Sequence, residues 1–225
     1  MNTQKQIRLG VWAQVLVVAA LALAGAGLAS CSTTVYKQGD RAADSAQAAA
    51  MQAQTESQAL AGTMATLNNL VDKPAPDLKL PFQSFNTALE GLAAAVKRGE
   101  LTGNHLVRSN AVFLAAWDKQ LTTITNADVR SRSEARRKEV GDQFNTAQSD
   151  YAQAQDALRS LIDYLQDIRR ALSTDLNANG VEAVKPLVGN ANTTATKVQT
   201  ALTQANASLT ALSAQMSSAR GPTAK

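Results

Sequence analysis

The sequence has little of the chemistry on which disulfide frameworks and metal centres depend. Its 225 residues include one cysteine, one histidine, five prolines and twelve glycines, and only 4% are aromatic. One cysteine excludes an intrachain disulfide framework and a cysteine-rich metal site, and one histidine excludes a histidine-based zinc or di-iron centre. Strands favour β-branched and aromatic residues, so the shortage of aromatics also argues against a β-rich fold.

Alanine, by contrast, is abundant. The chain has 43 alanines, and hydrophobic residues make up 45% of it. Because alanine is the best helix former and glycine and proline are scarce, this composition predicts an all-α protein.

The first thirty residues have the layout of a secretory signal peptide. Lys5 and Arg8 form a positive region, an apolar stretch follows from Val11, and small residues lead up to Cys31. Removal of residues 1–30 would leave 20 basic and 18 acidic side chains, a net charge of +2. That charge is weak evidence for an anionic partner.

The segment Leu28-Ala29-Ser30-Cys31 resembles the lipobox of bacterial lipoproteins. In that family the cysteine thiol is lipidated, the signal is cleaved before it, and the new N-terminus is acylated, typically with palmitate. Two alternatives remain: ordinary cleavage with Cys31 as a bystander, or retention of the apolar stretch, which is long enough to span a bilayer. In Gram-negative lipoproteins, an aspartate directly after the lipidated cysteine implies retention in the inner membrane. This chain has Ser32 at that position, so the resemblance implies the periplasmic side of the outer membrane.

From residue 40 onward, apolar residues recur at alternating spacings of three and four, which predicts helices packed as in coiled coils. The expected helices are 40–71, 82–123, 129–177 and 181–218. The clearest stripe is Val140, Phe144, Ala147, Tyr151, Ala154, Leu158, Leu161, Leu165, Ile168 and Leu172. In the first helix the stripe is Ala43, Ala46, Ala50, Ala53, Ser57, Leu60, Met64, Leu67 and Val71.

The connections between these segments are short. Asp72–Pro81 contains three prolines, Thr125–Asp128 supplies helix-capping residues, and Asn177–Gly180 resembles a helix C-cap. Short connections make neighbours antiparallel. The prediction is one elongated antiparallel bundle of three to four coiled-coil-like helices over residues 40–218. Cys31 and a short tether (31–39) precede it, and a disordered tail (219–225) follows.

Two glycines interrupt the second helix. Gly99 and Gly103 lie at stripe positions within Arg98–His105, which predicts either a break in the helix or the close approach of a neighbouring helix. Elsewhere, a closely packed heptad core leaves no room for a ligand cavity of about 300 Å³.

Few residues offer catalytic or metal-binding chemistry. His105 is expected at the surface, without a positioned partner for general-base catalysis. Asp163 and Asp167 are one helical turn apart, but Arg159 and Arg170 flank them, so a salt-bridged face is the better interpretation. We therefore expect no catalytic residue, no metal and no cofactor other than covalent lipid on Cys31.

One stretch is strongly basic, and its five basic residues are Arg130, Arg132, Arg136, Arg137 and Lys138. In an exported protein they could contact anionic lipid, lipopolysaccharide or cell-wall polymer, whereas nucleic acid is excluded as a partner by location. The competing interpretation is a solvated surface at the start of the third helix.

Two segments carry a family resemblance. Phe113–Ser133 reads FLAAWDKQLTTITNADVRSRS, and Leu172–Val184 reads LSTDLNANGVEAV, with Leu176-Asn177-Ala178 at its centre. Together with the lipobox, they resemble the exported bacterial proteins classed as domain of unknown function 2959, over roughly residues 82–218. The resemblance implies a periplasmic helical lipoprotein and carries over no catalytic residue.

These observations predict a non-enzymatic outer-membrane lipoprotein that acts through its surface as an envelope scaffold, spacer or adaptor. Its partner would be an envelope protein or polymer. The main alternative is a self-assembling or membrane-active bundle, in which the alanine-rich first helix repacks against another copy or against lipid. An envelope hydrolase is a third class, which would require a polar cleft around His105.

Overall fold

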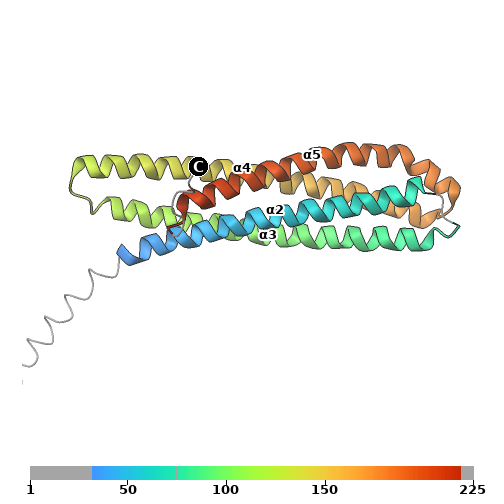
Figure 1. The fold of residues 1–225 in the computed structure, drawn as a ribbon, viewed down its shortest axis with the longest axis horizontal. Helices are drawn as coiled ribbons and strands as arrows, with labels where there is room; N and C mark the ends of the chain where they lie inside the picture. Colours follow the sequence, from blue (N-terminus) through green and yellow to red (C-terminus); the bar gives the residue numbers. More distant parts are fainter. Residues whose placement is uncertain (1–31, 74–75, 219–225) are drawn as a thin grey trace, which may run out of the picture.

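The computed structural model describes residues 32–73 and 76–218, which form four long helices (Figure 1). They are α2 (Ser32–Asp72), α3 (Lys79–Leu121), α4 (Ala127–Thr174) and α5 (Ala178–Met216). These ranges contain no strand, and none of their helices is apolar over a stretch long enough to cross a bilayer. The predicted lipobox, with Leu28, Ala29, Ser30 and Cys31, and the predicted tail (219–225) lie outside the described residues.

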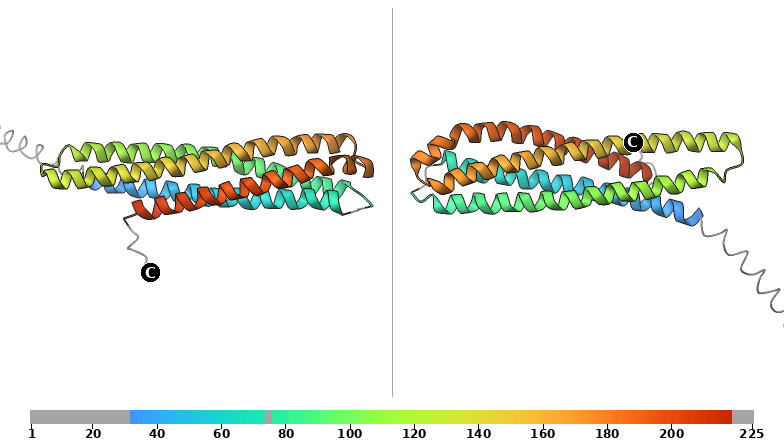
Figure 2. Two further views of the ribbon diagram at one scale, coloured as in Figure 1. Left: turned by 90° about the horizontal axis from the view of Figure 1, so that it is seen from above. Right: turned by 180° about the vertical axis from the view of Figure 1, so that it is seen from behind.

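The four helices run alternately up and down around a shared main core, and a second, smaller cluster contains Ala42, Phe113 and Val140. α2 packs against α3 and α5, and α4 packs against the same two helices. Figure 1 and Figure 2 show the resulting elongated rod from three directions. The predicted all-α, elongated antiparallel bundle is confirmed, with four helices rather than three.

The core follows the heptad stripes. All ten stripe positions predicted in α4, from Val140 to Leu172, are at most 4% exposed. In α2 the fully buried positions include Glu56 and Thr63, each one residue before a position of the predicted stripe. α2 contacts two neighbours on different sides, so its buried face is wider than one stripe.

The first helix begins earlier than predicted, at Ser32. Gly39 is buried against α3, where a β-carbon would lie 3.1 Å from Phe113 Cε2. Val35 packs against the cluster that contains Phe113. Because these contacts order the start of the helix, the described part of the predicted tether belongs to the bundle.

Asparagines cap two of the helices. The Asn126 side chain accepts a hydrogen bond from Val129 N at 3.0 Å and caps α4, as predicted. Asn177 accepts hydrogen bonds from the backbone N–H groups of Asn179 and Gly180, and so caps the start of α5. The prediction of a C-cap at Asn177–Gly180 is therefore wrong, because this asparagine serves the following helix rather than the preceding one.

α3 and α4 extend past the start of α2 and the end of α5 as a two-helix hairpin, which we call the tip (residues 114–139; Figure 2). The rings of Phe113 and Trp117 pack at its base, 5.3 Å apart. Trp117 Nε1 donates to Ser133 Oγ at 3.0 Å across the hairpin. Aromatic packing thus extends into the tip.

Candidate functional site

A glutamate lies in the middle of the core. Glu56, on α2, is 0% exposed, at a position where the heptad pattern calls for an apolar residue. Its Oε1 accepts a hydrogen bond from Gln52 Nε2 at 3.2 Å, and its Oε2 accepts one from Gln155 Nε2 at 2.6 Å. Gln52 Nε2 also donates to Ala95 O on α3 at 2.8 Å. The carboxyl group therefore connects α2, α3 and α4 through amide side chains.

Gly99 makes the space for this carboxyl group. A β-carbon at this position would lie 2.0 Å from Glu56 Oε1 and 2.8 Å from Gln155 Oε1, distances at which no side chain fits. The Tyr151 hydroxyl donates to Gly99 O at 3.1 Å. α3 runs through Arg98–His105 without interruption. The predicted break is therefore wrong, and side chains from α2 and α4, rather than a closely approaching helix backbone, fill the space beside Gly99.

Burial controls the acid–base chemistry of the cluster. It raises the pKa of the Glu56 carboxyl to about 7, because the charged form loses its hydration. Hydrogen bonds from Gln52 and Gln155 and the positive charge of Arg98 act in the opposite direction and limit this rise. Burial also raises the pKa of the Tyr151 phenol, and the charge of Glu56 adds to that rise. Glu56 can therefore gain or lose a proton near neutral pH.

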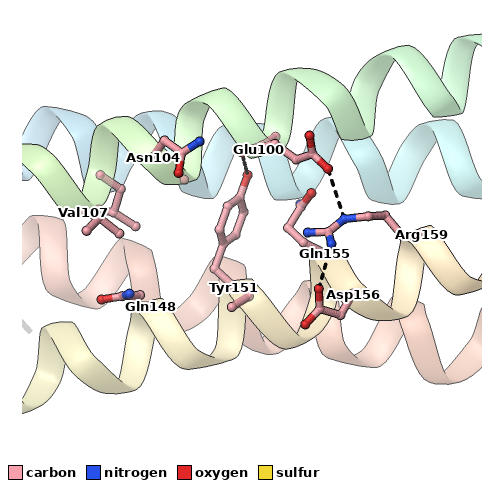
Figure 3. Close-up of a pocket in the computed structure, with 12 residues that line it drawn as sticks. Glu100, Asn104, Val107, Gln148, Tyr151, Gln155, Asp156 and Arg159 are labelled. Carbon is pink, nitrogen blue, oxygen red and sulfur yellow. Dashed lines mark hydrogen bonds and ion pairs between the residues drawn. The ribbon is translucent and has the colours of Figure 1, made fainter.

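A groove opens on the outer side of this cluster, between α3 and α4 (Figure 3). Its volume is about 360 Å³, and its lining includes Gly99, Gly103, Tyr151 and Gln155. A β-carbon at Gly103 would lie 3.1 Å from the Tyr151 ring, so a side chain at this position would press on the tyrosine that lines the groove. The expectation that the bundle would hold no cavity of about 300 Å³ is wrong.

Charged side chains close one end of the groove. Arg159 Nε lies 3.1 Å from Glu100 Oε1, and Arg159 Nη1 lies 3.1 Å from Asp156 Oδ1. The Arg159 guanidinium thus forms ion pairs with two carboxylates, which Figure 3 shows beside Gln155. The amides of Asn104 and Gln148 lie toward the other end (Figure 3).

His105 lies elsewhere, on a second and smaller groove. It is exposed, and its Nδ1 is 3.5 Å from Ser109 Oγ. The groove has a volume of about 240 Å³, and its charged lining residues other than His105 are Arg41 and Arg108. No carboxylate lines this groove to orient the imidazole as a general base.

Three of the five basic residues of the predicted anionic-surface contact form ion pairs with carboxylates. Arg137 forms a two-point pair with Asp118, at 2.7 and 2.8 Å. Arg136 pairs with Glu139 at 2.7 Å and Lys138 with Asp142 at 2.6 Å. Arg130 and Arg132, at the end of the tip, are exposed and have no ion-pair partner among the described residues. These two are the part of the basic stretch that is free to meet an anionic surface.

The acidic pair of α4 lies on a salt-bridged face. Asp167 pairs with Arg170, while Asp163 is exposed. Within residues 32–73 and 76–218, no three His, Cys, Asp or Glu side chains come together closely enough to hold a metal ion.

Sequence analysis missed the central residues of the site, Gln52, Glu56 and Gln155. A signal was present: the 4–3 spacing from Ala53 through Glu56, Leu60 and Thr63 is as regular as the stripe that was chosen. The charged residue in this stripe argues against its burial, because charged side chains are rarely buried. No signal in the sequence links Gln155 to Glu56, since they are 99 residues apart.

The chain was compared with curated proteins and with models of protein families. No curated protein matches it. The model of the family described as "Protein of unknown function (DUF2959)" matches residues 34–217, which include nearly all of the four helices and the whole of the groove. The chain therefore belongs to the DUF2959 family, as its sequence resemblance predicted.

Proposed function

We propose that the protein is a non-enzymatic lipoprotein of the Gram-negative outer membrane, anchored through Cys31, whose bundle acts as an envelope scaffold, spacer or adaptor. The observation that supports it best is that α2 is helical from the first described residue, Ser32, and packs along α3 and α5. A lipid on Cys31 would therefore lie close in sequence to residues that belong to the bundle. At about 1.5 Å per residue, the 48 residues of α4 make a rod roughly 70 Å long.

In this arrangement the tip would face the membrane. The start of α2, the end of α5 and the tip share one end of the rod (Figure 1). Arg130 and Arg132 would then lie among lipid headgroups, where each basic residue contributes about 1 kcal/mol at an anionic surface. The opposite end of the rod and its long sides would remain available for a periplasmic protein or polymer.

The alternative, a self-assembling or membrane-active bundle, requires the alanine-rich part of α2 to leave the core. Ala42, Ala46, Ala49 and Ala53 are all 0% exposed within a single chain. Small side chains bury little area each, so opening this end would cost less than opening the leucine-rich end. Sedimentation at several concentrations, with and without liposomes, distinguishes a monomer from this alternative.

Cys31→Ala tests the anchor. We expect the variant to leave the membrane fraction and to lose incorporation of a labelled fatty acid, whereas Ser32→Ala should retain both. A Cys31→Ala protein that stays in the membrane fraction at full abundance would exclude lipid anchoring. Crosslinking in live cells from exposed positions of α4, with mass spectrometry of the products, then identifies the partner. If no envelope component is captured from any face of the rod, the adaptor proposal fails.

A further inference from the structure

The groove between α3 and α4 contains a buried hydrogen-bond acceptor with no partner. Gln155 is 3% exposed, and its Nε2 donates to Glu56. Its Oε1 accepts no hydrogen bond from the described residues. A buried acceptor without a donor is unfavourable, so the side chain is suited to a donor that enters from the groove.

The charges around this acceptor favour a cation. Glu100 and Asp156 share the single guanidinium of Arg159, and the Glu56 carboxyl group lies directly behind Gln155. An anionic ligand would be repelled by these carboxylates. A sugar would find no exposed ring on which to stack, because Tyr151, the aromatic residue of the lining, is only 3% exposed.

We propose that this groove binds a small organic cation through a primary ammonium group, which donates to Gln155 Oε1 and lies beside the carboxylates of Glu100 and Asp156. An ammonium group has three N–H donors, one for each of these three side chains. The aliphatic part of the ligand would lie along the rest of the groove, toward Asn104 and Gln148. The proposal does not depend on the lipid anchor.

Binding would also displace the proton of Glu56. Of the charged groups around this carboxyl, Arg98 on α3 favours its ionised form. The Tyr151 phenol on α4 lies close enough for the charge of Glu56 to raise its pKa, and Glu100, Asp156 and Arg159 line the groove. The charged residues of α5, namely Glu182, Lys185 and Lys197, are all exposed. A cation at Gln155 favours the charged form of Glu56, so ligand binding and proton release are linked. Because burial raises the pKa of Glu56 to about 7, affinity should rise about ten-fold between pH 6 and pH 8.

Calorimetric titration of the full-length protein with cadaverine tests the site, and 1,5-pentanediol serves as the uncharged ligand of the same length. We expect saturable binding of cadaverine and none of the diol. Gln155→Met should weaken cadaverine binding at least about ten-fold, whereas Gln199→Met, the same change at an α5 residue bonded to Ser57, should not. Glu56→Gln should remove the pH dependence.

Glu100→Gln provides a second test that does not depend on a core substitution, because Glu100 is exposed. It should weaken binding several-fold while leaving the thermal unfolding curve in place. The proposal is overturned if wild-type protein does not bind cadaverine at pH 8, or if the diol binds equally well. Unchanged affinity in Glu100→Gln, or in a folded Gln155→Met protein, would overturn it as well.

Discussion

The carboxyl group of Glu56 occupies the space that Gly99 leaves empty: a β-carbon on the glycine would lie 2.0 Å from Glu56 Oε1. The two residues come from different helices, α2 and α3, and a larger residue at position 99 would displace the Glu56 carboxyl group. A buried carboxyl group needs space and hydrogen-bond donors, and a glycine lowers the stability of the helix that contains it. The glycine of α3 provides the space that the buried acid of α2 requires.

This relationship predicts opposite effects for two Gly→Ala substitutions in α3. Gly91 is exposed with nothing near its missing β-carbon, so Gly91→Ala should stabilise the helix by about 0.5–1 kcal/mol. Gly99→Ala should lower the free energy of unfolding by about 1–3 kcal/mol, because the methyl group overlaps Glu56 and Gln155. Urea denaturation of both variants measures the difference. Equal stability of the two would show that the Glu56 carboxyl can move away at no cost.

Glu56 also predicts how stability depends on pH. Its pKa in the fold, about 7, is above its ordinary value of 4.5, so the folded state favours the protonated acid. The contribution of Glu56 is therefore complete below about pH 4.5 and is lost as the pH rises through 7. The shift corresponds to roughly 3 kcal/mol.

Glu56→Gln should remove this dependence. The variant should be more stable than the wild type at pH 8 and close to it at pH 5, as measured by urea unfolding at both values. Glu134→Gln, a change at an exposed glutamate of α4, is the control and should behave as the wild type does. A Glu56→Gln protein with the wild-type pH profile would mean that Glu56 is charged throughout.

Substitutions at two neighbouring alanines of α2 should change the free energy of unfolding by very different amounts. Ala49 is 0% exposed and Ala48 is exposed. Ala49→Leu should lower the free energy of unfolding by about 1–3 kcal/mol, because α3 and α5 pack closely on this face. Ala48→Leu should change it by less than about 0.5 kcal/mol. If Ala49→Leu were tolerated as well as Ala48→Leu, the alanine-rich end would be open in solution, as the self-assembling alternative requires.

The tip should depend on its helix cap. Asn126→Ala removes the hydrogen bond from Val129 N and should destabilise the start of α4 by about 1 kcal/mol. Amide hydrogen exchange should be faster in the tip and unchanged in the core around Leu158. Thr125→Ala, one residue earlier and outside the cap, should leave exchange as it is. Uniformly faster exchange after Asn126→Ala would show that the tip and the bundle unfold together.

The sequence determined much of the fold because its signals are local. Alanine content and the 4–3 spacing of residues such as Leu158, Leu161 and Leu165 specify a helix and its buried face, since a helix repeats every 3.6 residues. Prolines between Asp72 and Pro81 and the cap at Asn126 mark where helices end and begin. The family, too, could be predicted from short segments.

Only the tertiary structure decided which residues meet across helices. Burial of Glu56, its bond to Gln155 and the groove over Gly99 depend on the order of helices around the core and on their axial alignment. Two helices that slide past each other by a whole heptad still bring apolar residues face to face. The heptad pattern therefore does not determine the axial alignment of the helices. The choice rests on pairs of residues such as an acid and a glycine, which fit together only in one alignment. The abundant alanines that first indicated a helical protein were therefore enough to predict the rod, but not the site that it contains.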